Sequence, residues 1–216
     1  MGRQSLLETL LQLIFPDRCA ACRTLGTLFC ATCQARLEAY QPDGRTLPSS
    51  LSQVHVAYVF QSPLREVIHQ LKYRKTRRIA QPLGQLLAEN IAPRAREFDA
   101  VAAIPLHPRR LSERGFNQAE ALAAVVAHIH KLPLITGPLT RTRDTAQQAA
   151  QANAHMRAAN MRDAFAWRGA SPPARILLVD DVYTTGATMG ACADALRAAG
   201  TADVQGLALA RTRPKP

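Results

Sequence analysis

Two adjacent carboxylates, Asp180 and Asp181, stand between an apolar run and a loop rich in hydroxyl groups. The run at 176–179 consists of Ile, Leu, Leu and Val, which is typical of a buried parallel strand. Open α/β sheets bind ligands at the carboxyl ends of such strands. The loop at 184–188 leads into an Ala-rich helix, so backbone amides and a helix N-terminus would face an anion. The segment therefore offers acceptors for sugar hydroxyls next to donors for a phosphate.

Residues 176–188 resemble the phosphoribosyl-pyrophosphate (PRPP) motif of type I phosphoribosyltransferases. Tyr183 stands where this motif usually has an aliphatic residue. The competing interpretation is a strand, a turn and a helix in which the acidic pair only caps the helix. The resemblance implies that PRPP binds to Asp180, Asp181, Val182, Tyr183, Thr184, Thr185, Gly186, Ala187 and Thr188.

Four of the five cysteines form two Cys-x2-Cys pairs near the N-terminus; they are Cys19, Cys22, Cys30 and Cys33. Four thiolates at about 2.3 Å from one ion close a tetrahedral site. A segment this short cannot bury a core of its own, so a metal would supply its folding energy. Structural zinc is the favoured ion, an iron–sulfur cluster is second, and disulfides are disfavoured in a chain with cytosolic character. The fifth cysteine, Cys192, is expected to be a small buried apolar residue.

The chain carries a net charge of +11, which favours phosphorylated substrates, nucleic acid or an anionic membrane as partners. A solvated basic surface without a partner is the alternative. Two basic clusters follow predicted strand ends, and a third lies at 72–78, so all three are expected near the Asp180 loop. We call the following set the basic rim, which would face a pyrophosphate: Lys72, Arg74, Leu106, His107, Arg109, Arg110 and Arg114.

Cations at this rim, together with Mg²⁺, would stabilise a pyrophosphate leaving group as its charge develops. The competing interpretation is a surface for single-stranded DNA, whose phosphates Lys and Arg would contact. Only Tyr73 and Phe116 are interleaved with the basic clusters, so the sequence gives little support for a base-stacking platform.

Alternating strand and helix patterns predict an α/β fold with a mostly parallel, doubly wound sheet. The expected strands are 54–60, 100–104, 132–139, 164–167, 175–179 and 204–210; the expected helices are 6–14, 63–92 with a break at 74–76, 117–130 and 187–199. We expect a helix and a four-cysteine zinc module at 1–40, a linker at 41–53 and the main domain at 54–216. No apolar run approaches the roughly 18 residues of a membrane span, and no signal peptide is recognised, so the cytoplasm is the expected location.

Several segments together resemble the ComF family across nearly the whole chain. They are the Phe15-Pro16 helix end, the two cysteine pairs, Leu-Lys-Tyr-Arg at 71–74, the Arg-Gly-Phe-Asn-Gln stretch within 104–118, and the 180–188 loop. The resemblance implies a type I phosphoribosyltransferase fold with a zinc-bearing N-terminal segment. It also implies a link to natural competence, or to the use of imported DNA as a nutrient.

The resemblance further implies roles for particular residues. Asp180 and Asp181 would bind the ribose hydroxyls, residues 184–188 the 5′-phosphate, and the turn at 105–110 the pyrophosphate. Residues 141–160 would form a mobile lid, and Arg143 would join the two aspartates in catalysis. The acceptor would be a base or an amine of unknown identity.

A second hypothesis has no turnover. In that case the PRPP fold would act as a sensor or scaffold, the basic rim would contact single-stranded DNA, and the zinc segment would dock a DNA-uptake helicase or processing protein. A homodimer is expected from the fold class alone.

Overall fold

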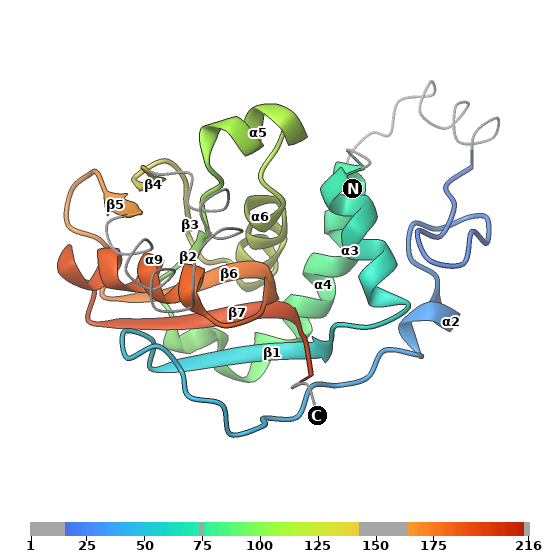
Figure 1. The fold of residues 1–216 in the computed structure, drawn as a ribbon, viewed down its shortest axis with the longest axis horizontal. Helices are drawn as coiled ribbons and strands as arrows, with labels where there is room; N and C mark the ends of the chain where they lie inside the picture. The colour runs from blue at the N-terminus through green and yellow to red at the C-terminus, as the bar shows by residue number, and fades with distance from the viewer. Residues whose placement is uncertain (1–15, 74–75, 143–163, 214–216) are drawn as a thin grey trace, which may run out of the picture.

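A computed structural model describes residues 16–73, 76–142 and 164–213, and its centre is a sheet of five parallel strands. The strand order is β1-β7-β6-β2-β3 (Figure 1). The strands are β1 (Gln53–Val59), β2 (Ala100–Ala103), β3 (Leu134–Ile135), β6 (Arg175–Tyr183) and β7 (Asp203–Arg211). β6 and β7 are buried along most of their length, as expected for strands covered on both faces. The predicted α/β class and parallel sheet are confirmed.

Helices cover both faces of this sheet. One face carries the first core cluster, built with α3 (Leu64–Tyr73), η1 (Arg77–Ile79), α4 (Ala80–Ile91) and α6 (Gln118–His130). The short helix η2 (Ala92–Glu97) follows α4. The other face carries α9 (Ala187–Ala198) and the small antiparallel sheet of β4 (Leu139–Arg141) and β5 (Phe165–Trp167). Among the described residues, no helix has the length and apolar character that crossing a bilayer requires.

Three predictions differ from the structure in detail. β6 continues to Tyr183, so Asp180 and Asp181 lie within the strand and not after it. The expected strand at 132–139 is two strands, because Pro133 precedes a two-residue edge strand and Gly137 turns the chain at φ +97°. The turn expected at 105–110 becomes helix α5 (Pro108–Arg114) from its fourth residue. The helix expected at 6–14 lies outside the described residues.

The segment that holds the four cysteines packs against α3. Phe29 is buried in the same core cluster as Leu71 of that helix. The Gln70 amide donates to the Ala20 carbonyl at 3.0 Å, and Arg78 forms a 2.9 Å ion pair with Asp17. Only a four-residue helix, α2 (Ala31–Gln34), is formed within the described part of this segment. The division into module, linker and main domain remains a prediction.

Candidate functional site

The two aspartates of the predicted motif lie near the end of β6, where α3 reaches them. Asp181 is 3% exposed, and its Oδ2 lies 2.5 Å from Nζ of Lys72, in the last turn of α3. Asp180 is half-buried, and its Oδ1 accepts from the Asp181 backbone N–H at 2.8 Å. Burial first, and then the charge of Asp181, raise the pKa of Asp180 well above its usual value. The pair therefore combines a carboxyl group of raised pKa with an ion-paired carboxylate.

The loop after β6 is shaped by one aromatic ring. Tyr183 is 2% exposed, and a Cβ added at Gly186 would lie 2.2 Å from the Tyr183 hydroxyl oxygen. Gly186 has φ +80°, a conformation that L side chains rarely adopt. A glycine is therefore required here both for its backbone conformation and for the space it leaves.

This loop presents donors to solvent. Thr184 and Thr185 are exposed, and the Ala187 N–H donates to the Thr185 hydroxyl oxygen at 3.4 Å. α9 begins without a side-chain cap, so the loop supplies no carboxylate or amide oxygen at this helix end. Val182 and Thr188 are half-buried on either side. Hydroxyls and first-turn amides next to two carboxylates form a combination that can bind a phosphorylated sugar.

The basic rim is partly assembled. Lys72, Arg110 and Arg114 line one cavity of about 250 Å³ with Tyr73 and Glu113, so the ends of α3 and α5 meet. The Arg114 guanidinium stacks 5.3 Å from the Tyr73 ring centre. This juxtaposition agrees with the convergence that the sequence predicts.

Other predicted rim residues lie elsewhere or serve the fold. The Nδ1 of His107 accepts from the Arg109 N–H at 3.3 Å and so caps α5. Arg109 pairs with Glu113 at 3.1 Å on the exposed side of the helix. Leu106 lines a separate cavity of about 130 Å³ with Pro105 and residues of the β3–β4 connection. Arg74, Arg143 and most of the expected lid at 141–160 lie outside the described residues.

Arg211, at the end of β7, packs against Tyr183 beneath the loop, and no pattern in the sequence predicts this contact. Its guanidinium lies 4.8 Å from the Tyr183 ring centre and donates to the Tyr40 hydroxyl at 3.1 Å. Asp43 lies 3.7 Å from the same guanidinium and also pairs with Arg45. Tyr40 and Arg211 are 171 residues apart in sequence, so no local pattern could have joined them.

The four predicted metal ligands lie together. The sulfurs of Cys19, Cys22, Cys30 and Cys33 are all within 4.8 Å of one another. Sulfurs around one zinc ion at 2.3 Å are about 3.8 Å apart in a tetrahedron, so this set fits a tetrahedral ion. Cys192 is buried in α9, as predicted.

The thiols of this set titrate unequally. Hydrogen bonds, chiefly from the Thr24 hydroxyl, lower the pKa of Cys22 to about 6. Burial and the neighbouring thiols raise the pKa of Cys33 to about 12. Four thiolates in one site therefore need a bound cation, and the cluster of four cysteines can hold zinc.

Comparisons with known proteins find relatives along most of the chain. DNA utilization protein YhgH of Escherichia coli K12 is 32% identical over 206 residues, 90% of each chain. YhgH of Salmonella typhi is 34% identical over 155 residues, 69% of this chain and 68% of its own. Competence protein F of Haemophilus influenzae is 30% identical over 195 residues, 85% of this chain and 84% of its own.

One family model, the histidine phosphatase superfamily (branch 1), matches residues 107–164. That match covers about a quarter of the chain and begins at His107, whose ring caps α5. The relatives, by contrast, extend over up to nine-tenths of the chain. The chain belongs to the ComF family.

Proposed function

We propose that this protein is a phosphoribosyltransferase-like protein that binds PRPP with Mg²⁺ and serves competence or the use of imported DNA. The observation that carries the proposal is the Asp180–Asp181 pair followed by the open loop and uncapped start of α9, all on one parallel sheet. The names of the relatives, DNA utilization protein and competence protein, support the biological setting.

Each group has a distinct task in this proposal. Asp180 and Asp181 accept hydrogen bonds from the ribose hydroxyls, and the amides and hydroxyls at 184–188 bind the 5′-phosphate. Lys72, Arg110 and Arg114 attract the pyrophosphate, as does Arg143, which lies outside the described residues. Mg²⁺ bound with PRPP would be held by these carboxylates and would neutralise charge on the leaving pyrophosphate.

Lys72 links the two halves of the site. It neutralises Asp181, and it borders the cavity of Arg110 and Arg114 from the last turn of α3. When PRPP binds, Lys72 can exchange the carboxylate for a pyrophosphate oxygen without leaving the site. A single ammonium group thereby joins α3 to β6 and would also serve as a ligand contact.

The test is isothermal titration of PRPP and Mg²⁺ into zinc-loaded protein. We expect the double variant Asp180→Asn/Asp181→Asn, and Asp181→Asn alone, to lose binding because the ribose acceptors and the metal-facing charge are removed. One hydrogen bond to a charged group contributes about 1.5–3 kcal/mol, or about 10- to 150-fold in affinity. The matched control is Asp99→Asn, which removes a carboxylate paired with Arg175 at the opposite end of β6.

Circular dichroism of each variant would confirm the fold. Unchanged PRPP affinity in a folded Asp181→Asn protein would contradict the site assignment. If wild-type protein binds PRPP, pyrophosphate release with candidate bases and amines would identify the acceptor and establish turnover.

A second candidate function is contact with single-stranded DNA, and the exposure of Tyr73 favours it. This ring is 60% exposed and lies between His69, at 4.7 Å, and Arg114. Aromatic rings beside cations are the usual stacking positions for unpaired bases. Lys72, Arg110 and Arg114 would then bind the phosphates of the DNA in place of a pyrophosphate.

Oligonucleotide binding at several salt concentrations would test this candidate. Arg110→Glu/Arg114→Glu should lower the salt slope by about 1.4, since each single-strand phosphate contact contributes about 0.7. Arg94→Glu/Arg96→Glu, in η2, is the control of equal charge change. An equal salt slope in the wild type and both variants would exclude Arg110 and Arg114 as DNA contacts. Competition between PRPP and the oligonucleotide would show that both ligands bind at the basic rim.

A further inference from the structure

The first strand of the sheet has an edge that is only half covered. The backbone amides of Ser52 and Phe60 donate to β7, at the carbonyls of Val204 and Arg211. Even-numbered residues of β1 therefore face β7, and odd-numbered residues face outward, because a strand repeats every two residues. The outward groups of Ala57 and Val59 are paired: the Ala57 carbonyl accepts from Tyr40, and the Val59 amide donates to Glu38.

This cover stops at Pro42. Residues 38–40 run antiparallel to β1, and the next residue that could donate to the edge is Pro42, which has no N–H. The chain then leaves the strand. Within the described part of the chain, the outward N–H and C=O of His55 form no backbone hydrogen bond. Such an open edge is a template for another strand.

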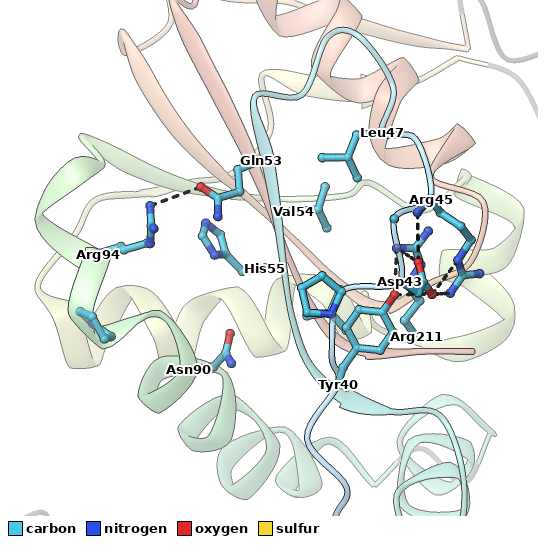
Figure 2. A pocket seen from close by; sticks show the side chains of 14 residues that line it. Tyr40, Asp43, Arg45, Leu47, Gln53, Val54, His55, Asn90, Arg94 and Arg211 are labelled. Atoms are coloured by element: carbon cyan, nitrogen blue, oxygen red, sulfur yellow. Dashed lines mark hydrogen bonds and ion pairs between the residues drawn. The ribbon is translucent and has the colours of Figure 1, made fainter. Parts of the chain in front are cut away.

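A cavity of about 480 Å³ lies at this open half of β1. Figure 2 shows His55, Asn90 and Arg94 on one side of the strand and Leu47, Val54 and the Arg45–Arg211 cluster on the other. An added strand would send alternate side chains to these two sides. The volume lies within the range of peptide-sized and ligand-sized pockets.

The charge of the lining favours an acidic occupant. Three arginines and one aspartate line the cavity, so its formal charge is three minus one, or +2. Arg211 is buried, and its Nε has no hydrogen-bond partner among the described residues. The Arg94 side chain is 47% exposed. Among the described residues, it donates to the Gln53 side-chain oxygen at 3.3 Å and forms an ion pair with Glu97 at 3.7 Å.

We propose that the open half of β1 binds a short, extended, acidic peptide segment of a partner protein. The peptide would add a strand antiparallel to β1, in line with residues 38–40, through the outward N–H and C=O of His55. Its acidic side chains would meet Arg94 on one side and the partly exposed Arg45 on the other. About four residues span this edge at about 3.4 Å each. None of the residues proposed to contact PRPP lines this cavity, so the proposal does not depend on PRPP binding.

Substitution of His55 separates backbone pairing from charge. His55→Pro removes an outward N–H, whereas the amides of Val54 and Val56 that face β7 are untouched. His55→Ala is the matched control, because it removes the same side chain and keeps the N–H. The probe is a fluorescein-labelled peptide of alternating Glu and Val, measured by fluorescence anisotropy with the full-length zinc-loaded protein.

We expect His55→Ala to bind like wild type and His55→Pro to bind about tenfold more weakly, the order of loss expected for one unmade hydrogen bond. Arg94→Glu should weaken binding several-fold, and the same peptide with Lys in place of Glu should not bind. A peptide with N-methyl groups along one backbone edge should also lose binding to the wild-type protein.

If His55→Pro does not fold, the N-methylated peptide still tests whether the peptide pairs with the backbone of β1. Equal affinity for the methylated and unmethylated peptides would show attraction by charge alone and overturn the proposal. Sedimentation in the same buffer tests a different occupant: a wild-type dimer that dissociates in His55→Pro would assign the edge to a second copy of this chain and also overturn it.

Discussion

At the residue scale, the proposed site is defined by two adjacent carboxyl groups, of which one is paired with an ammonium group. Lys72 neutralises Asp181, and no cation of the described residues lies in an ion pair with Asp180. Burial and the neighbouring charge of Asp181 disfavour the charged form of Asp180, so its pKa is raised. Because Mg²⁺ would favour the charged form, we expect binding of PRPP with Mg²⁺ to depend on pH.

This arrangement predicts an unusual pH dependence of stability. The pKa of Asp180 is raised on folding, so the native state binds more protons than the unfolded state above about pH 4. Its contribution to the free energy of unfolding is then lost as pH rises from about 4 to the folded pKa, by at most about 1.4 kcal/mol per pH unit. Asp180→Asn should remove this loss and be more stable than wild type near neutral pH.

Urea unfolding at a series of pH values measures the effect. Asp99→Asn is the comparison, because the contribution of Asp99 to the free energy of unfolding changes with pH in the opposite direction. A hydrogen bond from Arg175 lowers the pKa of Asp99, so the stability it adds is present above about pH 4 and lost on acidification. An Asp180→Asn protein whose stability follows the wild-type curve would contradict the raised pKa.

Local motifs made the carboxylates, the loop and the cysteines predictable, because their chemistry depends on neighbours in sequence. Lys72 was predicted as part of a pyrophosphate rim, but its ion pair with Asp181 depends on how α3 packs. The Tyr40–Asp43–Arg211 cluster joins segments far apart in the chain, and sequence patterns carry no signal for such a contact.

At the element scale, the β6–α9 connection is held in shape by packing beneath it. Tyr183 fills the space under Gly186, and Arg211 lies against the other part of the ring. The aromatic residue at a position that is usually aliphatic therefore has a structural role here. It supports a backbone that leaves the first-turn amides of α9 accessible.

Gly186→Ala should disrupt this support. The substitution combines a left-handed backbone, at about 1–2 kcal/mol, with overpacking against Tyr183, so we expect a total of about 2–4 kcal/mol. Gly44→Ala is the control, since Gly44 has φ +72° but no atom within 4 Å of the added Cβ. It should lose only about 1–2 kcal/mol. Equal losses in urea unfolding would show that Tyr183 does not constrain the loop.

Most strands and the periodic helix at 117–130 agree closely with the sequence prediction, whereas the segment at 132–139 and helix α5 differ from it. The helix expected at 117–130 is α6, with Asn117 as its N-cap, accepting from Ala119 at 3.0 Å. The resemblance implies a turn at 105–110, whereas the structure has the seven-residue helix α5 from Pro108 onward. Its signals were nonetheless present: a capping His107, a proline at the first position and Gly115 at the end.

At the scale of the whole molecule, the cysteine module and the α/β sheet share a core. Cys19, Phe29 and Cys33 belong to the same buried cluster as the helices on one face of the sheet. The module therefore stabilises α3, which carries Lys72 to Asp181. Loss of metal should affect the proposed PRPP site as well as the cysteines.

Removal of zinc with a chelator should lower the melting temperature of the whole protein by at least about 5 °C, in one transition. Addition of zinc should restore it, and Cys22→Ser/Cys30→Ser should melt at the lower temperature without chelator. Calorimetry measures the transition. A separate low-temperature transition, with the main one unmoved, would show that the module unfolds alone.

The pairing of β1 with β7 has a consequence for how the protein is made. Gln53 lies opposite Gln205, so the ribosome must add most of the chain between synthesis of the two partners. Because β7 lies between β1 and β6, the first strand has no place in the sheet until the last strand emerges. Contacts so distant in sequence form slowly, and waiting strands are prone to aggregate. A nascent chain that ends before Asp203 would hold β1 without its partner in the sheet.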